Sequence, residues 1–132
     1  MLLRQPMLIK ITYLWITLSL FILSGCATEQ AIGFQSNIKP ILKNKCQKCH
    51  LPPDGEGYLE TGLNMESYDS LMNGNVYGKV VIPGDSKRSV LNKLVEGRAG
   101  DMMTMPHGDA KNLTAEEIEF FKLWVNQGAL NN

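Results

Sequence analysis

The chain has 132 residues, which is enough for one domain and too few for two of ordinary size. Its 13 Lys and Arg residues balance 13 Asp and Glu residues, so no excess of charge favours nucleic acid or an anionic surface. An apolar fraction of 44% excludes a disordered chain, and three cysteines are too few for a disulfide-stabilised scaffold. The composition therefore predicts one folded domain that binds no nucleic acid.

The first 25 residues have the pattern of an export signal. Arg4 and Lys10 supply positive charge, and the uncharged run 11–23 follows them. This run is shorter than the roughly 20 apolar residues that cross a bilayer as a helix, and it matches the apolar region of a signal peptide. The alternative is a short core helix followed by a buried cysteine.

The residues that follow the apolar run indicate lipid attachment. Leu23-Ser24-Gly25-Cys26 resembles a bacterial lipobox, which implies cleavage before Cys26 and diacylation of its thiol. Two acyl chains anchor a protein stably, so we expect a membrane-anchored lipoprotein on the periplasmic side. By the same resemblance, Ala27 favours the outer membrane over the inner membrane.

Without the signal peptide over residues 1–25, a small domain remains. We expect a lipid-anchored tether over residues 26–32 and a folded domain over residues 33–132. Loss of Arg4 and Lys10 leaves 11 basic and 13 acidic residues, a formal charge of −2. A chain of this size buries only about 60–65% of its unfolded surface, so its core is marginal on its own. A covalently held cofactor would complete such a core.

Helical periodicity begins ahead of the first cysteine of this domain. Phe34, Ile38, Ile41 and Leu42 recur at i, i+4, i+7 and i+8, the spacing of one apolar helix face. Pro40 lies inside this pattern, so the helix either kinks there or its regular part begins there.

The next segment, Cys46-Gln47-Lys48-Cys49-His50, has the C-x-x-C-H spacing of c-type haem attachment. Its two thiols form thioethers with the haem vinyl groups, and His50 follows directly, so its imidazole is aimed at the iron as the proximal ligand. Haem of this type is attached outside the cytoplasm, in agreement with the export signal. We therefore expect one covalent haem c.

Three other kinds of site account for fewer of these five residues than haem attachment does. A thioredoxin-like redox motif needs a βαβ context, which the flanking residues do not supply. A zinc site needs four N or S ligands, and His107 is the only further His or Cys in the domain. A disulfide between Cys46 and Cys49 leaves His50 without a role.

Short elements are expected after the motif. Residues 51–57 are rich in Pro, Gly and Asp, which predicts a loop. Residues 66–72 predict a short helix that ends at Asn73-Gly74. The apolar, β-branched residues 80–82 predict an extended segment.

A second short helix follows a turn at residues 83–85. Asp85 or Ser86 is placed to cap its N-terminus. The apolar residues expected on it are Val90, Leu91, Leu94 and Val95.

Residues 100–108 offer the sixth iron ligand. Met105 provides a soft thioether, and Pro106 fixes the backbone beside it. We expect Met105 as the distal ligand, with His107 as the runner-up and an empty sixth position as the third possibility. Other methionines fill gaps in the core: Met65, Met72 and at least one of Met102 and Met103.

The last helix has the clearest signals. Thr114 and Glu117 form a capping box, and Gly128 occupies the position of a C-terminal glycine cap. One apolar face is expected between them: Ile118, Phe121, Trp124 and Val125.

An ordered set of motifs over residues 34–129 resembles the planctomycete-type cytochrome c domain, a relative of the class I cytochromes c. These motifs are Ile38–Leu42 before the haem motif, Gly62–Met65 leading to Ser67–Leu71, Val81–Ser86, Met105-Pro106, Leu113–Ile118 and Trp124–Ala129.

This resemblance implies an all-α fold in which the terminal helices cross over one covalently attached haem. It implies Phe34 against the Phe121 and Trp124 face, with His50 as proximal and Met105 as distal ligand. Leu51-Pro52 replaces the glycine that usually follows the haem histidine, so the resemblance assigns no carbonyl to orient the His50 ring.

Two functions from different classes follow. The first is a one-electron carrier between extracytoplasmic redox proteins, and it is the one we expect. The alternative is a haem enzyme or sensor whose sixth iron position opens to peroxide or a gas. Peroxidase-type chemistry needs a distal acid or base and a charge-stabilising arginine, for which His107 and Arg98 are the candidates.

Overall fold

The computed structural model describes residues 30–108 and 112–132. The expected signal peptide, Cys26 and most of the tether lie outside the described residues. Ala31–Asn132 form one compact unit of short helices. The described residues contain no strand beyond an isolated bridge between Asn75 and Gly78, which confirms the all-α fold class. Within the same residues, no helix has the length and apolar character required to span a bilayer.

The helical segment before the haem motif has two parts. A π-helix, η2 (Phe34–Ile38), leads directly into α2 (Lys39–Lys45). Pro40 lies in the first turn of α2, and the regular α-helix begins there, after the wider turns of η2. The predicted apolar face is confirmed, because all four of its residues are buried: Phe34, Ile38, Ile41 and Leu42.

Two short helices follow α2. The helix α3 (Gln47–His50) carries the end of the haem motif, and α4 (Glu56–Thr61) ends at Gly62 with φ of +70°. The expected loop over residues 51–57 is therefore too long. Its Pro- and Gly-rich composition marks only the turn before α4, because the N–H of Leu59 already donates to the Gly55 carbonyl at 2.8 Å.

The helix expected over residues 66–72 is present as α5 (Tyr68–Asn73). Ser67 caps it in a capping box with Ser70, and Gly74 ends it. Val80 and Val81 then lie buried in an irregular segment.

The helix α6 (Val90–Val95) begins later than its expected caps. Its N-cap residue is Ser89, so the prediction of Asp85 or Ser86 as cap is wrong. The Asp85 carboxylate instead accepts a hydrogen bond from the N–H of Arg88 at 2.9 Å, within the turn that precedes the helix.

The last helix, α7 (Ala115–Asn126), confirms its capping box. The Thr114 N–H donates to the Glu117 carboxylate at 2.7 Å, and the Glu117 N–H donates to the Thr114 hydroxyl at 3.2 Å. Gly128 follows with φ of +101°. Lys45 Nζ lies 3.9 Å from the Glu117 carboxylate, so the start of α7 is joined to the end of α2.

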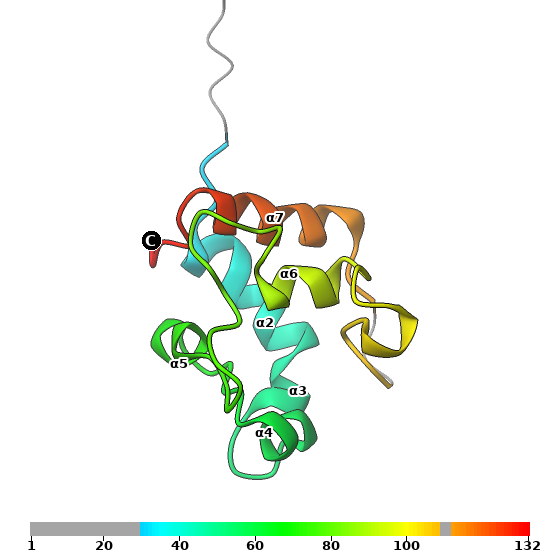
Figure 1. Cartoon of the computed structure of the whole chain (residues 1–132). Helices are drawn as coiled ribbons and strands as arrows, with labels where there is room; N and C mark the ends of the chain where they lie inside the picture. Colours follow the sequence, from blue (N-terminus) through cyan, green and yellow to red (C-terminus); the bar gives the residue numbers. More distant parts are fainter. Residues whose placement is uncertain (1–29, 109–111) are drawn as a thin grey trace, which may run out of the picture. The chain divides into compact units, whose positions relative to one another are not determined.

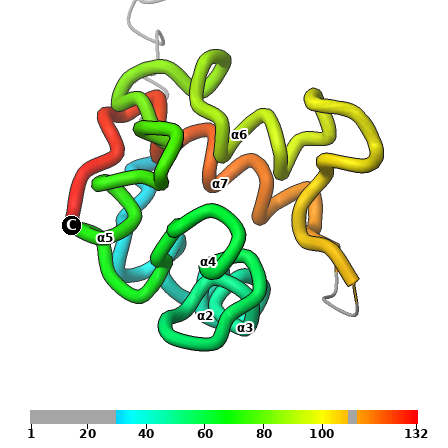
Figure 2. The backbone as a smooth tube through the Cα atoms, turned by 60° about the horizontal axis from the view of Figure 1, so that its bottom comes forward, coloured from blue at the N-terminus to red at the C-terminus, as the bar shows by residue number. Residues whose placement is uncertain are grey.

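The core lies where η2 and α6 pack against α7 (Figures 1 and 2). Trp124 and Phe34 are fully buried, and their ring centroids lie 5.7 Å apart. Tyr68 packs edge-on against Phe34 at 5.2 Å. The contact between Phe34 and the α7 face, expected from the family resemblance, is therefore present.

The two ends of the compact unit meet beside η2. Ile32 is buried, and its N–H donates to the Gln127 side chain at 2.9 Å. Asn132 accepts hydrogen bonds from the N–H groups of Phe34 and Gln35, at 3.1 and 2.9 Å. The packed unit thus already includes Ile32, and its last residue caps the first helical segment.

Candidate haem site

The junction of α2 and α3 arranges the haem motif. The N–H of Cys46 closes α2 on the Leu42 carbonyl at 2.9 Å. The Cys46 carbonyl accepts from the N–H groups of both Cys49 and His50, at 3.1 and 3.0 Å. One tight turn therefore gathers Cys46, Cys49 and His50, and both thiols are free and half-buried.

Cys46 lies against the hydrophobic core. Burial, and then the neighbouring Cys49 and Glu117, raise the pKa of the Cys46 thiol to about 12. The thiol is therefore neutral at neutral pH. A thioether carries no ionisable proton, so bonding this sulfur to carbon suits an environment that disfavours a thiolate.

His50 is 9% exposed, and its Nδ1 is buried without a hydrogen-bond partner. Burial is the main influence on the ring and lowers its pKa, while the Leu63 backbone and the Glu60 carboxylate act in the opposite direction. The imidazole is therefore neutral at neutral pH, which is the form that binds a metal. A buried, neutral imidazole in one turn with two free thiols fits a role as iron ligand.

The chain beyond His50 folds back over the imidazole. Gly57, in the first turn of α4, lies so close that a Cβ built on it would be 2.6 Å from His50 Cε1. Sequence reasoning missed this contact, because Gly57 falls in the run that predicted a loop. In the sequence, the contact is marked only by a glycine four residues before Thr61, which gives no indication of His50.

Met105 differs from the other methionines of its segment. It is half-buried against the core, and its N–H donates to the Leu94 carbonyl of α6 at 3.1 Å. Met102 and Met103 lie in a 3-10 turn, η3 (Asp101–Met103), and are 89% and 52% exposed. The expectation that one of them fills the core is wrong, because η3 has no buried residue. The same expectation is confirmed elsewhere: Met65 and Met72.

His107, the other candidate distal ligand, is exposed. The part of the chain that the structure describes holds no group of three His, Cys, Asp or Glu side chains that could bind a metal ion. The His50 imidazole and the Met105 thioether are donors that suit an iron whose remaining ligands come from a porphyrin. By these tests the residues fit a haem.

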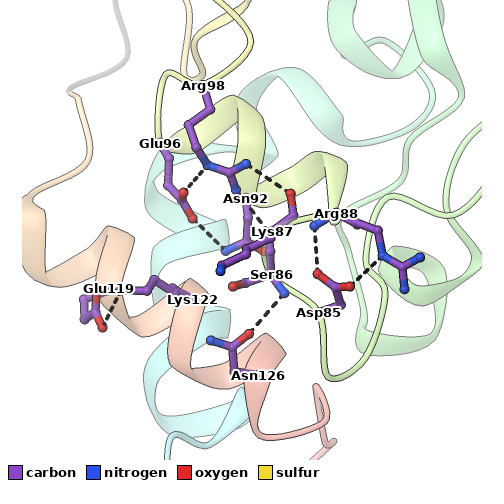
Figure 3. A network of polar contacts seen from close by, with 10 residues as sticks. All are labelled: Asp85, Ser86, Lys87, Arg88, Asn92, Glu96, Arg98, Glu119, Lys122 and Asn126. Carbon is purple, nitrogen blue, oxygen red and sulfur yellow. Dashed lines mark hydrogen bonds and ion pairs between the residues drawn. The ribbon is translucent and has the colours of Figure 1, made fainter.

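Arg98 is held at the end of α6 (Figure 3). Its guanidinium pairs with Glu96 and donates to the carbonyls of Ser86 and Lys87, both at 3.1 Å. The N–H of Ser86 in turn donates to Asn126 of α7 at 3.1 Å. Arg98 thus ties the segment before Met105 to the turn before α6. Its guanidinium N–H groups are used in these contacts, which differ from the charge-stabilising role of an arginine in a peroxidase.

The comparisons with known proteins agree with this site. Residues 46–109 match the family model described as planctomycete cytochrome C. This segment is a planctomycete cytochrome c domain. No match was found among curated proteins or among solved structures.

This cytochrome c domain begins with the haem motif at Cys46, and Met105 lies near its end. The family implies haem-based electron transfer, and the spacing of Cys46 and Cys49 is consistent with covalent haem c. Members of the cytochrome c family are typically electron carriers.

Proposed function

We propose that the protein is a lipid-anchored, monohaem c-type cytochrome that passes single electrons between extracytoplasmic redox proteins. The observation that carries the proposal is His50, a buried, neutral imidazole in the same turn as two free thiols. Cys46 and Cys49 would hold the haem covalently, and His50 would be its proximal ligand. The haem supplies the one-electron chemistry, and the protein supplies attachment, ligation and burial.

Met105 is the proposed distal ligand. Its support is the contrast with its neighbours, because Met105 packs inward while Met102, Met103 and His107 are exposed. A thioether opposite an imidazole raises the reduction potential and fills the sixth position. A filled position favours a carrier over an enzyme or sensor, which needs an open one.

Replacing Met105 tests both the ligand and the function. We expect ferric wild-type protein to show the weak long-wavelength sulfur-to-iron band and ferrous protein to bind carbon monoxide poorly. Met105→Ala should remove the band, lower the potential and admit carbon monoxide. Met103→Ala is the matched control, since it removes an exposed thioether from the same segment, and it should change none of these.

Other outcomes would replace parts of the proposal. Loss of low-spin character in His107→Ala alone would identify a bis-His site. Wild-type protein that binds carbon monoxide readily and turns over peroxide would be an enzyme or sensor. Mass spectrometry that finds no covalent haem on exported wild-type protein would overturn the proposal as a whole.

A further inference from the structure

The chain between α3 and α5 forms a closed excursion that begins and ends beside His50. The His50 carbonyl accepts a hydrogen bond from the N–H of Met65 at 2.9 Å. The Gln47 side chain donates to the Met65 carbonyl at 2.8 Å and holds the same closure from the first residue of α3. Residues 51–64 therefore form a loop whose two ends meet beside His50.

Within this excursion, α4 is fixed at both ends. At its start, the N–H of Gly55 donates to the Leu51 carbonyl at 2.9 Å. At its end, the Thr61 hydroxyl donates to the Gly57 carbonyl at 2.6 Å, and the N–H of Gly62 donates to the Tyr58 carbonyl at 2.7 Å. These bonds leave the backbone of residue 57 little freedom to move away from the ring beside it.

Gly57 is in contact with the face of the His50 ring. A Cβ at residue 57 would lie 2.6 Å from Cε1, 2.8 Å from Nε2 and 3.0 Å from Nδ1. All three distances are well below the roughly 3.5–4.0 Å of a favourable contact between heavy atoms. Gly57 is helical and is not among the glycines with positive φ, so its backbone conformation suits any residue. The contact with the imidazole is therefore what requires glycine here.

We propose that Gly57 is a positioning residue for the proximal ligand: it lets α4 close over the imidazole and so sets the orientation of the His50 ring. The inference rests on the proposed role of His50 as iron ligand. A methyl group at residue 57 must rotate the ring or displace α4. Either change alters how the imidazole meets the iron, without removing the ligand or the two cysteines.

The test is Gly57→Ala in the full-length, haem-loaded protein. We expect covalent haem to be retained, while the g values of the ferric low-spin electron paramagnetic resonance spectrum and the reduction potential both shift. Alanine is a better helix former than glycine, so a variant without a clash would be at least as stable as the wild type and spectroscopically unchanged. Unchanged g values and potential would overturn the inference.

Two control variants separate this effect from general perturbation. Gly33→Ala places its Cβ 2.6 Å from the flexible hydroxyl of Ser36 instead of an imidazole. Leu59→Ala alters α4 at a side chain that is 69% exposed. Both should keep the wild-type g values, and a shift equal to that of Gly57→Ala in either would overturn the inference.

A measurement on wild-type protein covers the case in which Gly57→Ala does not fold. In ferrous, low-spin protein, the Gly57 Hα protons should show nuclear Overhauser effects to the His50 ring and lie upfield of ordinary glycine shifts. Their absence would contradict the contact. Wild-type protein without covalent haem would contradict the proposed function, whereas haem-loaded protein without these signals would contradict only the role of Gly57.

Discussion

Asp85 and Arg88 form the ion pair at the start of the turn before α6. The Asp85 carboxylate accepts from the backbone N–H of Arg88 at 2.9 Å and from its Nε at 2.6 Å (Figure 3). These hydrogen bonds hold the pKa of Asp85 below its ordinary value of 3.8. The folded protein therefore binds this proton less readily than the unfolded chain, and the resulting stabilisation is present above pH 3.8 and is lost as the pH falls through the folded-state pKa.

We predict that Asp85→Asn is less stable than wild type at neutral pH and that this difference shrinks as the pH falls below 3.8. The effect is small, because the pair is exposed. Urea denaturation of both proteins over a series of pH values measures it. Arg88→Gln should reproduce part of the difference, and the double variant should be less than additive. A stability difference that grows toward acid pH would contradict the assignment.

Residue roles could be predicted from the sequence only where they follow from local spacing. The C-x-x-C-H spacing is enough to identify Cys46, Cys49 and His50 as a group. Gly57 could not be identified, because its role depends on α4 returning to His50 through a closure at Met65. Spacing along the chain does not encode that return.

Among the helices, α7 depends most clearly on its cap. Thr114 and Glu117 satisfy each other's backbone N–H groups. We predict that Thr114→Ala lowers the free energy of unfolding by about 1 kcal/mol, within the range of about 0.5–2 for a lost N-cap. Thr114→Ser retains the hydroxyl and should lose only a fraction of this. Chemical denaturation of the three proteins decides the matter, and equal losses in both variants would exclude the hydroxyl as the cause.

The bounds of a helix could be predicted where the apolar spacing and the capping residues indicate the same start, as in α7. They could be predicted less well where the candidate capping side chains bind other groups, as before α6. The sequence places several oxygen-bearing side chains ahead of α6, and any of them has cap chemistry. In the folded chain the Ser89 hydroxyl donates to the Asp85 carbonyl, and the Asp85 carboxylate is used by Arg88. The start of α4 was missed for a related reason, because Pro and Gly mark a turn without showing where a helix resumes.

At the scale of the whole molecule, the proposed anchor precedes the packed unit by few residues. Ala31 begins that unit, and Ile32 is already buried in it. We predict that Cys26→Ser releases the haem domain from the membrane fraction, since diacylation of the Cys26 thiol is what would hold it there. Fractionation and labelling with palmitate measure this. A Cys26→Ser protein that stays in the membrane fraction and still incorporates palmitate would contradict the anchor.

The fold class followed from the haem motif and the helical periodicity, because both constrain a small chain strongly. The relation between the segments that carry the two proposed iron ligands could not be predicted in the same way. His50 belongs to α3, and Met105 follows α6 in a segment secured by Arg98. Long-range bonds from one side chain to two carbonyls are not visible in a single sequence, so Met105 could be named from its chemistry but not placed.

The closure between the His50 carbonyl and the Met65 N–H makes residues 51–64 a loop that starts and ends at one place in the fold. Because the excursion returns to the point it left, α3 and α5 are joined by this closure as well as by the chain between them, and Leu63 of the excursion is itself buried in the core. The inner surface of the excursion faces the imidazole through Gly57. Substitution within this one segment would therefore alter the electronic properties of the iron in the proposed haem while the rest of the scaffold is kept.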